Sequence, residues 1–168
     1  MKLGRRSAET VDIRAKRGPD APRRHGGIPW RALSLYASVG LGSILGGTLR
    51  WLASTFIQDH LGSGLPWGTL FVNVVGSFVI GFYAALTGPD GRLSAGSLQR
   101  QFVTAGLCGG FTTFSMFSLE TVQLVQNGDP HRAAFNVAVS VAGWMIAVWA
   151  GYVLATRLNR PGSPRPKG

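Results

Sequence analysis

The stretch Cys108–Phe117, CGGFTTFSMF, decides the fold that this sequence predicts. It lies within an apolar segment, yet glycine, threonine and serine fill half of its positions. Glycine weakens a helix, and irregular backbone at membrane depth survives only when it is buried in protein or lines a polar cavity. We therefore predict that this segment is a helix broken near its middle, where Gly109-Gly110 and Thr112-Thr113 follow each other.

The stretch belongs to the third of four long apolar runs. These runs are Leu33–Phe56, Pro66–Thr87, Phe102–Val125 and Ala133–Thr156. Each approaches or exceeds the ~20 residues that a helix needs to cross ~30 Å of hydrocarbon. Four such runs in succession, with almost no charge, are rare in soluble proteins. We predict an all-α membrane protein with four transmembrane helices in one domain, residues 32–156.

Basic residues gather outside the apolar runs. Nine of the seventeen Lys and Arg residues lie within residues 1–31, and four follow Thr156. Segments rich in Arg, Pro and Gly bury too little apolar surface to fold, so residues 1–31 and 157–168 are predicted to be disordered tails. Because the charge sits in the tails, we expect it to contact anionic membrane lipid and not nucleic acid.

The same charges predict the orientation of the chain. Four spans place both termini and the connection at residues 88–98 on one side, which carries fifteen Lys and Arg residues. The other side carries only Arg132. The positive-inside rule therefore predicts a multi-pass protein of the cell inner membrane with both termini in the cytoplasm.

Polar side chains inside the runs are candidates for function, because each is costly to bury in lipid. Thr69, Asn73 and Ser77 share one helical face of the second run. The Asn73 amide has two N–H donors that a lipid-facing position would leave unpaired, so we predict that it faces a polar interface or a pore. In the fourth run, Ser140 follows Asn136 by four residues.

Charged residues in the runs are few. Arg50 lies late in the first run, where its guanidinium either snorkels to the interface or holds a positive charge at an anion vestibule. Glu120 falls late in the third run, within reach of an interface. The centres of the runs hold no carboxylate, which argues against a proton-coupled transporter. The single cysteine, Cys108, is expected to be a small packing residue.

A break in the third helix would expose polar backbone groups to a solute. Converging carbonyls can replace the water shell of a cation, whereas amides and hydroxyls such as those of Thr113 and Ser115 can meet an anion. Phe114 and Phe117 follow on one helical face, and a phenyl ring is positive at its edge. The two rings could simply pack against neighbouring helices. Together with the glycines, the threonines and Asn73, however, the pattern favours a pore for a small, hard anion.

Two motifs carry a resemblance to a known family. PWGTLFVNVVGSFVIG at residues 66–81 and GLCGGFTTFSMFSLE at residues 106–120 resemble the CrcB/Fluc fluoride-specific ion channels, and GGTLRW at residues 46–51 agrees with that family. The resemblance covers all four runs and leaves both tails outside. It implies a passive channel that exports fluoride and lowers its cytoplasmic concentration. It also implies an antiparallel dimer with two pores.

The resemblance further implies roles for single residues. The pore-lining phenylalanines, asparagine and serine of the family match Phe114, Phe117, Asn73 and Ser140. Its first-span arginine matches Arg50. A structural Na⁺, which is not transported, lies on backbone carbonyls that match those of Gly109 and Thr112.

Three features depart from the family pattern. Met116 stands where the family usually has Thr, and Asn136 occupies a place often held by Tyr. The third is the charge bias, since an antiparallel homodimer needs a chain that inserts both ways. We therefore hypothesise that the chain pairs with a related, oppositely oriented subunit, and a second copy of the chain is the alternative.

Other classes of protein fit the sequence less well. A small four-helix multidrug exporter would need a membrane-embedded Glu in the first span, and residues 33–56 contain no acidic residue. A non-transporting structural subunit would not explain the Gly-Thr-Phe stretch. We do not expect an enzyme, because no cluster of His, Asp, Glu or Cys is positioned to do chemistry.

Overall fold

The structure is a computed structural model that describes residues 30–62, 64–89 and 91–159. Its elements, all of them helices, are α1 (Trp30–Leu61), α2 (Trp67–Leu86), α3 (Ser97–Gln101), the π-helix η2 (Phe102–Cys108), α4 (Gly109–Phe111), α5 (Phe114–Gln126) and α6 (Pro130–Asn159). The predicted all-α class is confirmed. The tails predicted at the two ends lie outside the described residues, except that residues 30–31 begin α1 and residues 157–159 end α6.

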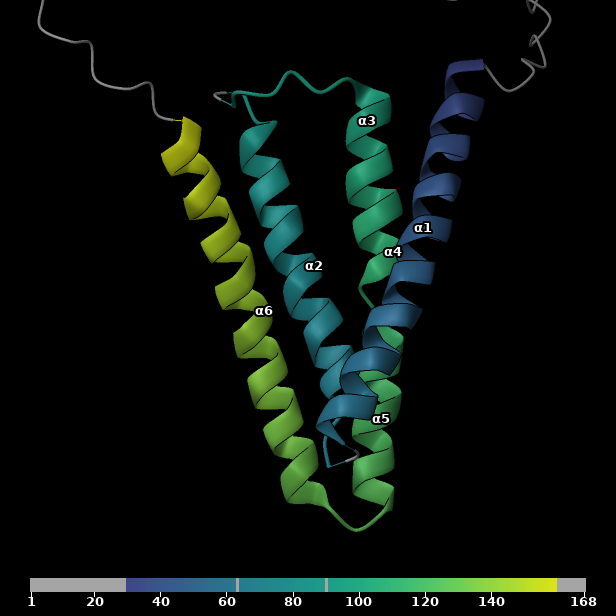
Figure 1. Ribbon diagram of the computed structural model, residues 1–168, viewed down its shortest axis with the longest axis vertical. Coiled ribbons are helices and arrows are strands. Elements are labelled where there is room, and N and C mark those ends of the chain that lie inside the picture. Colours follow the sequence, from purple (N-terminus) through teal and green to yellow (C-terminus); the bar gives the residue numbers. More distant parts are fainter. Residues whose placement is uncertain (1–29, 63, 90, 160–168) are drawn as a thin grey trace, which may run out of the picture.

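Four helical segments are long and apolar enough to cross a membrane. They are α1, α2, the series α3, η2, α4 and α5 taken together, and α6, so the four predicted spans are confirmed in number and order. The start of α1, the end of α6 and the α2–α3 connection lie at one end of the molecule (Figure 1). The α1–α2 and α5–α6 connections lie at the opposite end. The first span is longer than predicted, because α1 continues past Phe56 to Leu61.

The spans pack in two main pairs, α2 against α6 and α1 against η2 and α4. Glycines bring the backbones of the second pair into contact. A Cβ added at Gly42 would lie 2.9 Å from the Cα of Gly106, and one added at Gly46 would overlap the backbone of the third span. A Cβ at Gly110 would lie 2.6 Å from the Ser43 carbonyl oxygen. Two small-xxx-small pairs, Gly42 with Gly46 and Gly106 with Gly110, therefore face each other within one chain.

The third span is interrupted between α4 and α5. Thr112 (φ −85°, ψ 159°) and Thr113 (φ −150°, ψ 119°) have extended backbone. The predicted break near the middle of the span is confirmed, but it lies at the threonines, because Gly109 and Gly110 remain helical against α1. The seven residues before Gly109 form the π-helix η2. π-helical turns often occur at functional sites. The sequence did not predict the π-helix.

Candidate functional site

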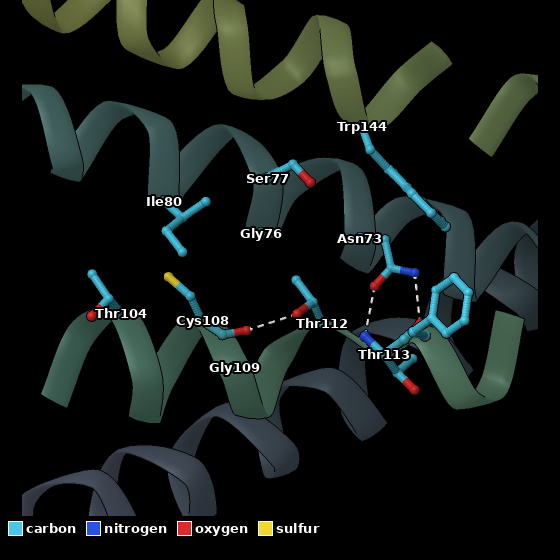
Figure 2. A pocket seen from close by; sticks show the side chains of 11 residues that line it. Asn73, Gly76, Ser77, Ile80, Thr104, Cys108, Gly109, Thr112, Thr113 and Trp144 are labelled. Atoms are coloured by element: carbon cyan, nitrogen blue, oxygen red, sulfur yellow. Dashed lines mark hydrogen bonds between the residues drawn. The ribbon is translucent and has the colours of Figure 1, made fainter. Parts of the chain in front are cut away.

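Asn73 on α2 bridges the break in the third span. Its Oδ1 accepts a hydrogen bond from the Thr113 backbone N–H at 2.7 Å, and its Nδ2 donates to the Thr113 carbonyl at 2.9 Å (Figure 2). Both residues are buried. The Asn73 amide thus pairs the Thr113 N–H that the break takes out of the helix, which would cost about 1–3 kcal/mol if it were left unpaired. It adds a second bond to the Thr113 carbonyl, which as the N-cap carbonyl also begins the hydrogen bonding of α5. Asn73 was predicted to face a polar interface or a pore, and in the structure its amide binds the backbone of Thr113. We call this pair of hydrogen bonds the clamp.

The clamp changes the surroundings of the Gly109 carbonyl. In an unbroken helix, the Thr113 N–H would donate to that carbonyl four residues earlier. Because this N–H donates to Asn73, the Gly109 oxygen loses its usual helical donor. Gly109 is also exposed, and a Cβ added there would meet only the Thr104 carbonyl oxygen, at 3.8 Å.

Arg50 points from α1 to the same break. Because α1 continues to Leu61, Arg50 lies well inside the helix and its side chain is half-buried. Its Nη1 lies 3.5 Å from the Thr112 carbonyl oxygen, at the long limit of a hydrogen bond. The guanidinium therefore places a positive charge beside the extended segment.

A first cavity of about 280 Å³ lies between α2, the third span and α6 (Figure 2). None of the described residues that line it is charged. The polar groups of its lining are amides, hydroxyls and an indole, from Asn73, Ser77, Thr104, Thr112, Thr113 and Trp144. Gly109, Cys108 and Phe114 also line it. The cavity therefore brings Asn73 together with four predicted site residues of the third span, Gly109, Thr112, Thr113 and Phe114, whereas Ser115 and Phe117 are not in its lining.

A second cavity, of about 400 Å³, lies on the other side of the break and contains the charged groups. Its lining includes Arg50, Asp59 and Glu120. Oε1 of Glu120 accepts a hydrogen bond from the Thr69 hydroxyl at 2.9 Å, whereas Oε2 is buried without a partner among the described residues. Thr113 lines both cavities, so the extended backbone forms part of the wall between them.

The two predicted pore phenylalanines stand in different surroundings. Their ring centroids are 5.6 Å apart, as expected for neighbours on one helical face. Phe114 is 71% exposed in the single chain, whereas Phe117 is 7% exposed. Phe117 meets Trp144 of α6 nearly edge to face, with centroids 4.9 Å apart and an interplanar angle of 76°. Phe114 is thus available to a solute or a partner, and Phe117 is held inside the chain.

The Thr113 hydroxyl caps the start of α5. Thr113 Oγ1 accepts a hydrogen bond from the Met116 backbone N–H at 3.2 Å, which is the usual role of threonine at an N-cap. The same oxygen lies 3.2 Å from the Ser115 hydroxyl, and Ser115 is exposed. The helix therefore resumes directly after the break.

Ser140 lines neither of these two cavities. It is 1% exposed, and its hydroxyl lies 3.5 Å from Oδ1 of Asn136. Asn136 in turn donates to the Thr121 hydroxyl at 2.9 Å. The two residues that the sequence singled out in the fourth run therefore link α6 to α5. Trp144 and Glu120 line the cavities although sequence reasoning gave neither a role there, because only the packing of the spans brings them to the break.

These features define a class of protein: a small multi-pass membrane protein whose third span is broken beside polar cavities. The family model described as "CrcB-like protein, Camphor Resistance (CrcB)" matches residues 37–152. The chain is 58% identical to "Fluoride-specific ion channel FluC 1" of Rhodopseudomonas palustris (strain BisB18) over 127 residues, 76% of this chain and 90% of that protein. It is 51% identical to "Fluoride-specific ion channel FluC" of Paramagnetospirillum magneticum (strain ATCC 700264 / AMB-1), over 74% of this chain and 98% of that protein. The chain belongs to the CrcB family, and the resemblance found in its motifs is confirmed.

Proposed function

We propose that this protein is a fluoride-specific ion channel that passively exports fluoride from the cytoplasm. The observation that carries the proposal is the Asn73–Thr113 clamp, which holds a helix break beside a cavity lined by neutral polar groups. The relatives named as fluoride-specific ion channels support the choice of ion. An ion channel is not a class of enzyme, and the function needs no catalytic residue.

The first cavity offers what a small anion needs when it leaves water. The donors of its lining include the Ser77 hydroxyl and the Asn73 amide, and the ring of Phe114 also lines it, whereas the Thr112 hydroxyl donates to the Cys108 carbonyl at 3.0 Å. Hydrogen-bond donors and ring edges can replace part of the hydration shell, and neutral donors release the anion more readily than a fixed charge does. In the second cavity, on the other side of Thr113, the guanidinium of Arg50 would attract an anion locally, beside the break, although the carboxyl groups of Asp59 and Glu120 also line that cavity.

Passive conduction suits the chemistry of fluoride. Neutral HF enters cells from acid surroundings, ionises in the cytoplasm and is trapped there as the anion. A pathway for the anion alone therefore lowers the internal concentration without coupling to another gradient. The uncharged lining of the first cavity is consistent with this, because proton coupling generally needs an ionisable relay.

The proposal is tested by fluoride efflux from liposomes that hold the assembly purified through a tag on this chain, with any related subunit that co-purifies. We expect fluoride efflux well above that of protein-free vesicles. Phe114→Ile removes a ring edge and should slow efflux roughly tenfold or more. Phe135→Ile, the same change at an exposed position of α6 that lines neither cavity, should conduct as the parent does. Absence of efflux from the parent assembly contradicts the proposed function.

We further propose that the channel is an antiparallel, dual-pore dimer of the inner membrane. Exposure of Gly109, Phe114 and Ser115 on the third span supports a partner that covers this face. The charge bias favours a related subunit of opposite orientation over a second copy, and it favours cytoplasmic termini.

A structural Na⁺ belongs to the same proposal. The Gly109 carbonyl suits a cation because the clamp has removed its helical donor, whereas the Thr112 carbonyl is shared with the Arg50 guanidinium. Two carbonyls are too few to replace a hydration shell, so the equivalent pair of the partner subunit would be required. When bound, the ion would supply positive charge that ties the two broken spans together.

Orientation can be measured with cysteines introduced into the connections, since the only native cysteine, Cys108, is buried. With a membrane-impermeant maleimide on intact cells whose outer membrane has been opened, we expect Asn127→Cys, at an exposed position after α5, to be labelled. We expect Ser94→Cys, at an exposed position between α2 and α3, to react only after the inner membrane is opened. Labelling of about half of each variant from outside would show that the chain inserts both ways, and would favour the homodimer.

A further inference from the structure

The indole of Trp144 on α6 is a buried hydrogen-bond donor without an acceptor. Its Nε1 is screened from solvent and makes no hydrogen bond to any described residue. A buried tryptophan N–H usually has a partner, and lipid cannot provide one at membrane depth. An orphaned donor in such a place calls for an acceptor that the described residues do not supply.

The position of Trp144 indicates what this acceptor is. Trp144 lines the first cavity together with Asn73, Thr113 and Phe114. In Figure 2 its side chain extends from α6 toward the end of the cavity where Asn73 bonds to Thr113. The nearly perpendicular contact with Phe117 fixes the plane of the indole. The fourth span therefore brings a rigid donor to the end of the cavity where the second and third spans meet.

The donors at this end of the cavity are neutral. Asn73 uses one N–H on the Thr113 carbonyl, which leaves its second amide hydrogen. The indole N–H donates and does not accept, so this group can bind an anion and not a cation.

We propose that the Trp144 N–H is a hydrogen-bond donor to fluoride in the first cavity, and hence a further residue of the anion pathway. The inference rests on the proposed function and assigns the fourth span a direct part in it. Trp144 lines the cavity and the ring of Phe117 fixes the orientation of its indole, so the two aromatic residues act together.

The proposal is tested by a variant that lacks the N–H donor of residue 144 but keeps an aromatic ring there. Trp144→Phe keeps an aromatic ring for the contact with Phe117 and lacks the N–H. In the purified assembly, we expect fluoride efflux to fall about tenfold to a hundredfold, the range for losing a hydrogen bond to a charged partner. Trp149→Phe, at an exposed position of α6, is the matched control and should leave efflux unchanged. Elution volume and melting temperature of Trp144→Phe should match the parent, and parental efflux from this variant would overturn the proposal.

A binding measurement separates this inference from the proposed function. In the purified assembly labelled with ¹⁵N at the indoles, the Trp144 signal is identified by its loss in Trp144→Phe. We expect this signal to move downfield in a saturable way with NaF, and not with NaCl at equal ionic strength. A signal that does not respond to NaF overturns the role of Trp144 even if efflux falls. A parent assembly without efflux would instead contradict the channel function, and the titration would still decide whether the indole binds fluoride.

Discussion

Asn73→Asp is expected to abolish fluoride efflux, because the carboxylate can accept from the Thr113 N–H but has no hydrogen to donate to the Thr113 carbonyl. That carbonyl now lies 2.9 Å from the amide nitrogen, and it would face a negative oxygen instead. The site is 5% exposed, so solvent cannot screen the repulsion. Loss of the bond to the Thr113 carbonyl costs about 0.5–1.5 kcal/mol, the buried charge adds the repulsion from that carbonyl, and it also repels the anion that should pass.

Acid pH separates these two effects. A protonated carboxyl offers one O–H donor and one acceptor, as the amide does, so it can restore both bonds to Thr113. We therefore expect Asn73→Asp to regain part of its efflux as the pH falls, after the leak of HF through protein-free vesicles is subtracted. Asn73→Ala removes the clamp without adding charge, and it should conduct poorly at every pH. Equal, pH-independent efflux from both variants would show that the clamp does not support the pathway.

The spans and the existence of the break could be predicted, because both depend on local sequence. Length and hydropathy mark the four helices, and the Gly-Gly-Phe-Thr-Thr run marks the weak point. The location of the break within that run could not be predicted, since it depends on distant contacts. Gly110 stays helical because the backbone of α1 packs on it near Ser43, and Thr113 leaves the helix because Asn73, forty residues earlier, supplies replacement bonds.

For individual site residues too, local sequence could predict some features, whereas features that depend on distant contacts could not be predicted. Asn73 could be singled out from its cost in lipid, but its partner could not. Ser140 was predicted to line the pore, but its hydroxyl lies 3.5 Å from Oδ1 of Asn136, and neither residue lines either of the two cavities described here. Trp144 resembled any aromatic residue of a membrane helix, and only the approach of α6 to α5 makes it a neighbour of Phe117.

Gly46→Ala is expected to cause the second large effect, a loss of folded protein. The new Cβ would overlap the Leu107 carbonyl oxygen and lie 2.8 Å from the Phe111 nitrogen and 3.1 Å from the Gly110 carbonyl carbon. All three are backbone atoms, so no change of rotamer can relieve the overlap and α1 must move away. We expect destabilisation of about 3 kcal/mol or more, at or above the upper end for overpacked cores. A lower yield of monodisperse protein and a lower melting temperature would report it.

Gly47→Ala is the matched control, because a Cβ at the next position meets nothing within 4 Å. Alanine favours a helix over glycine by about 0.8–1 kcal/mol, so this variant should be as stable as the parent or slightly more stable. Gly46 also lies one turn before Arg50, on the same face of α1, so displacement of the helix would move the guanidinium away from the Thr112 carbonyl. Any Gly46→Ala protein that does fold should therefore conduct fluoride more slowly than Gly47→Ala. Parental stability and efflux in Gly46→Ala would mean that the close contact between α1 and the third span does not position the break.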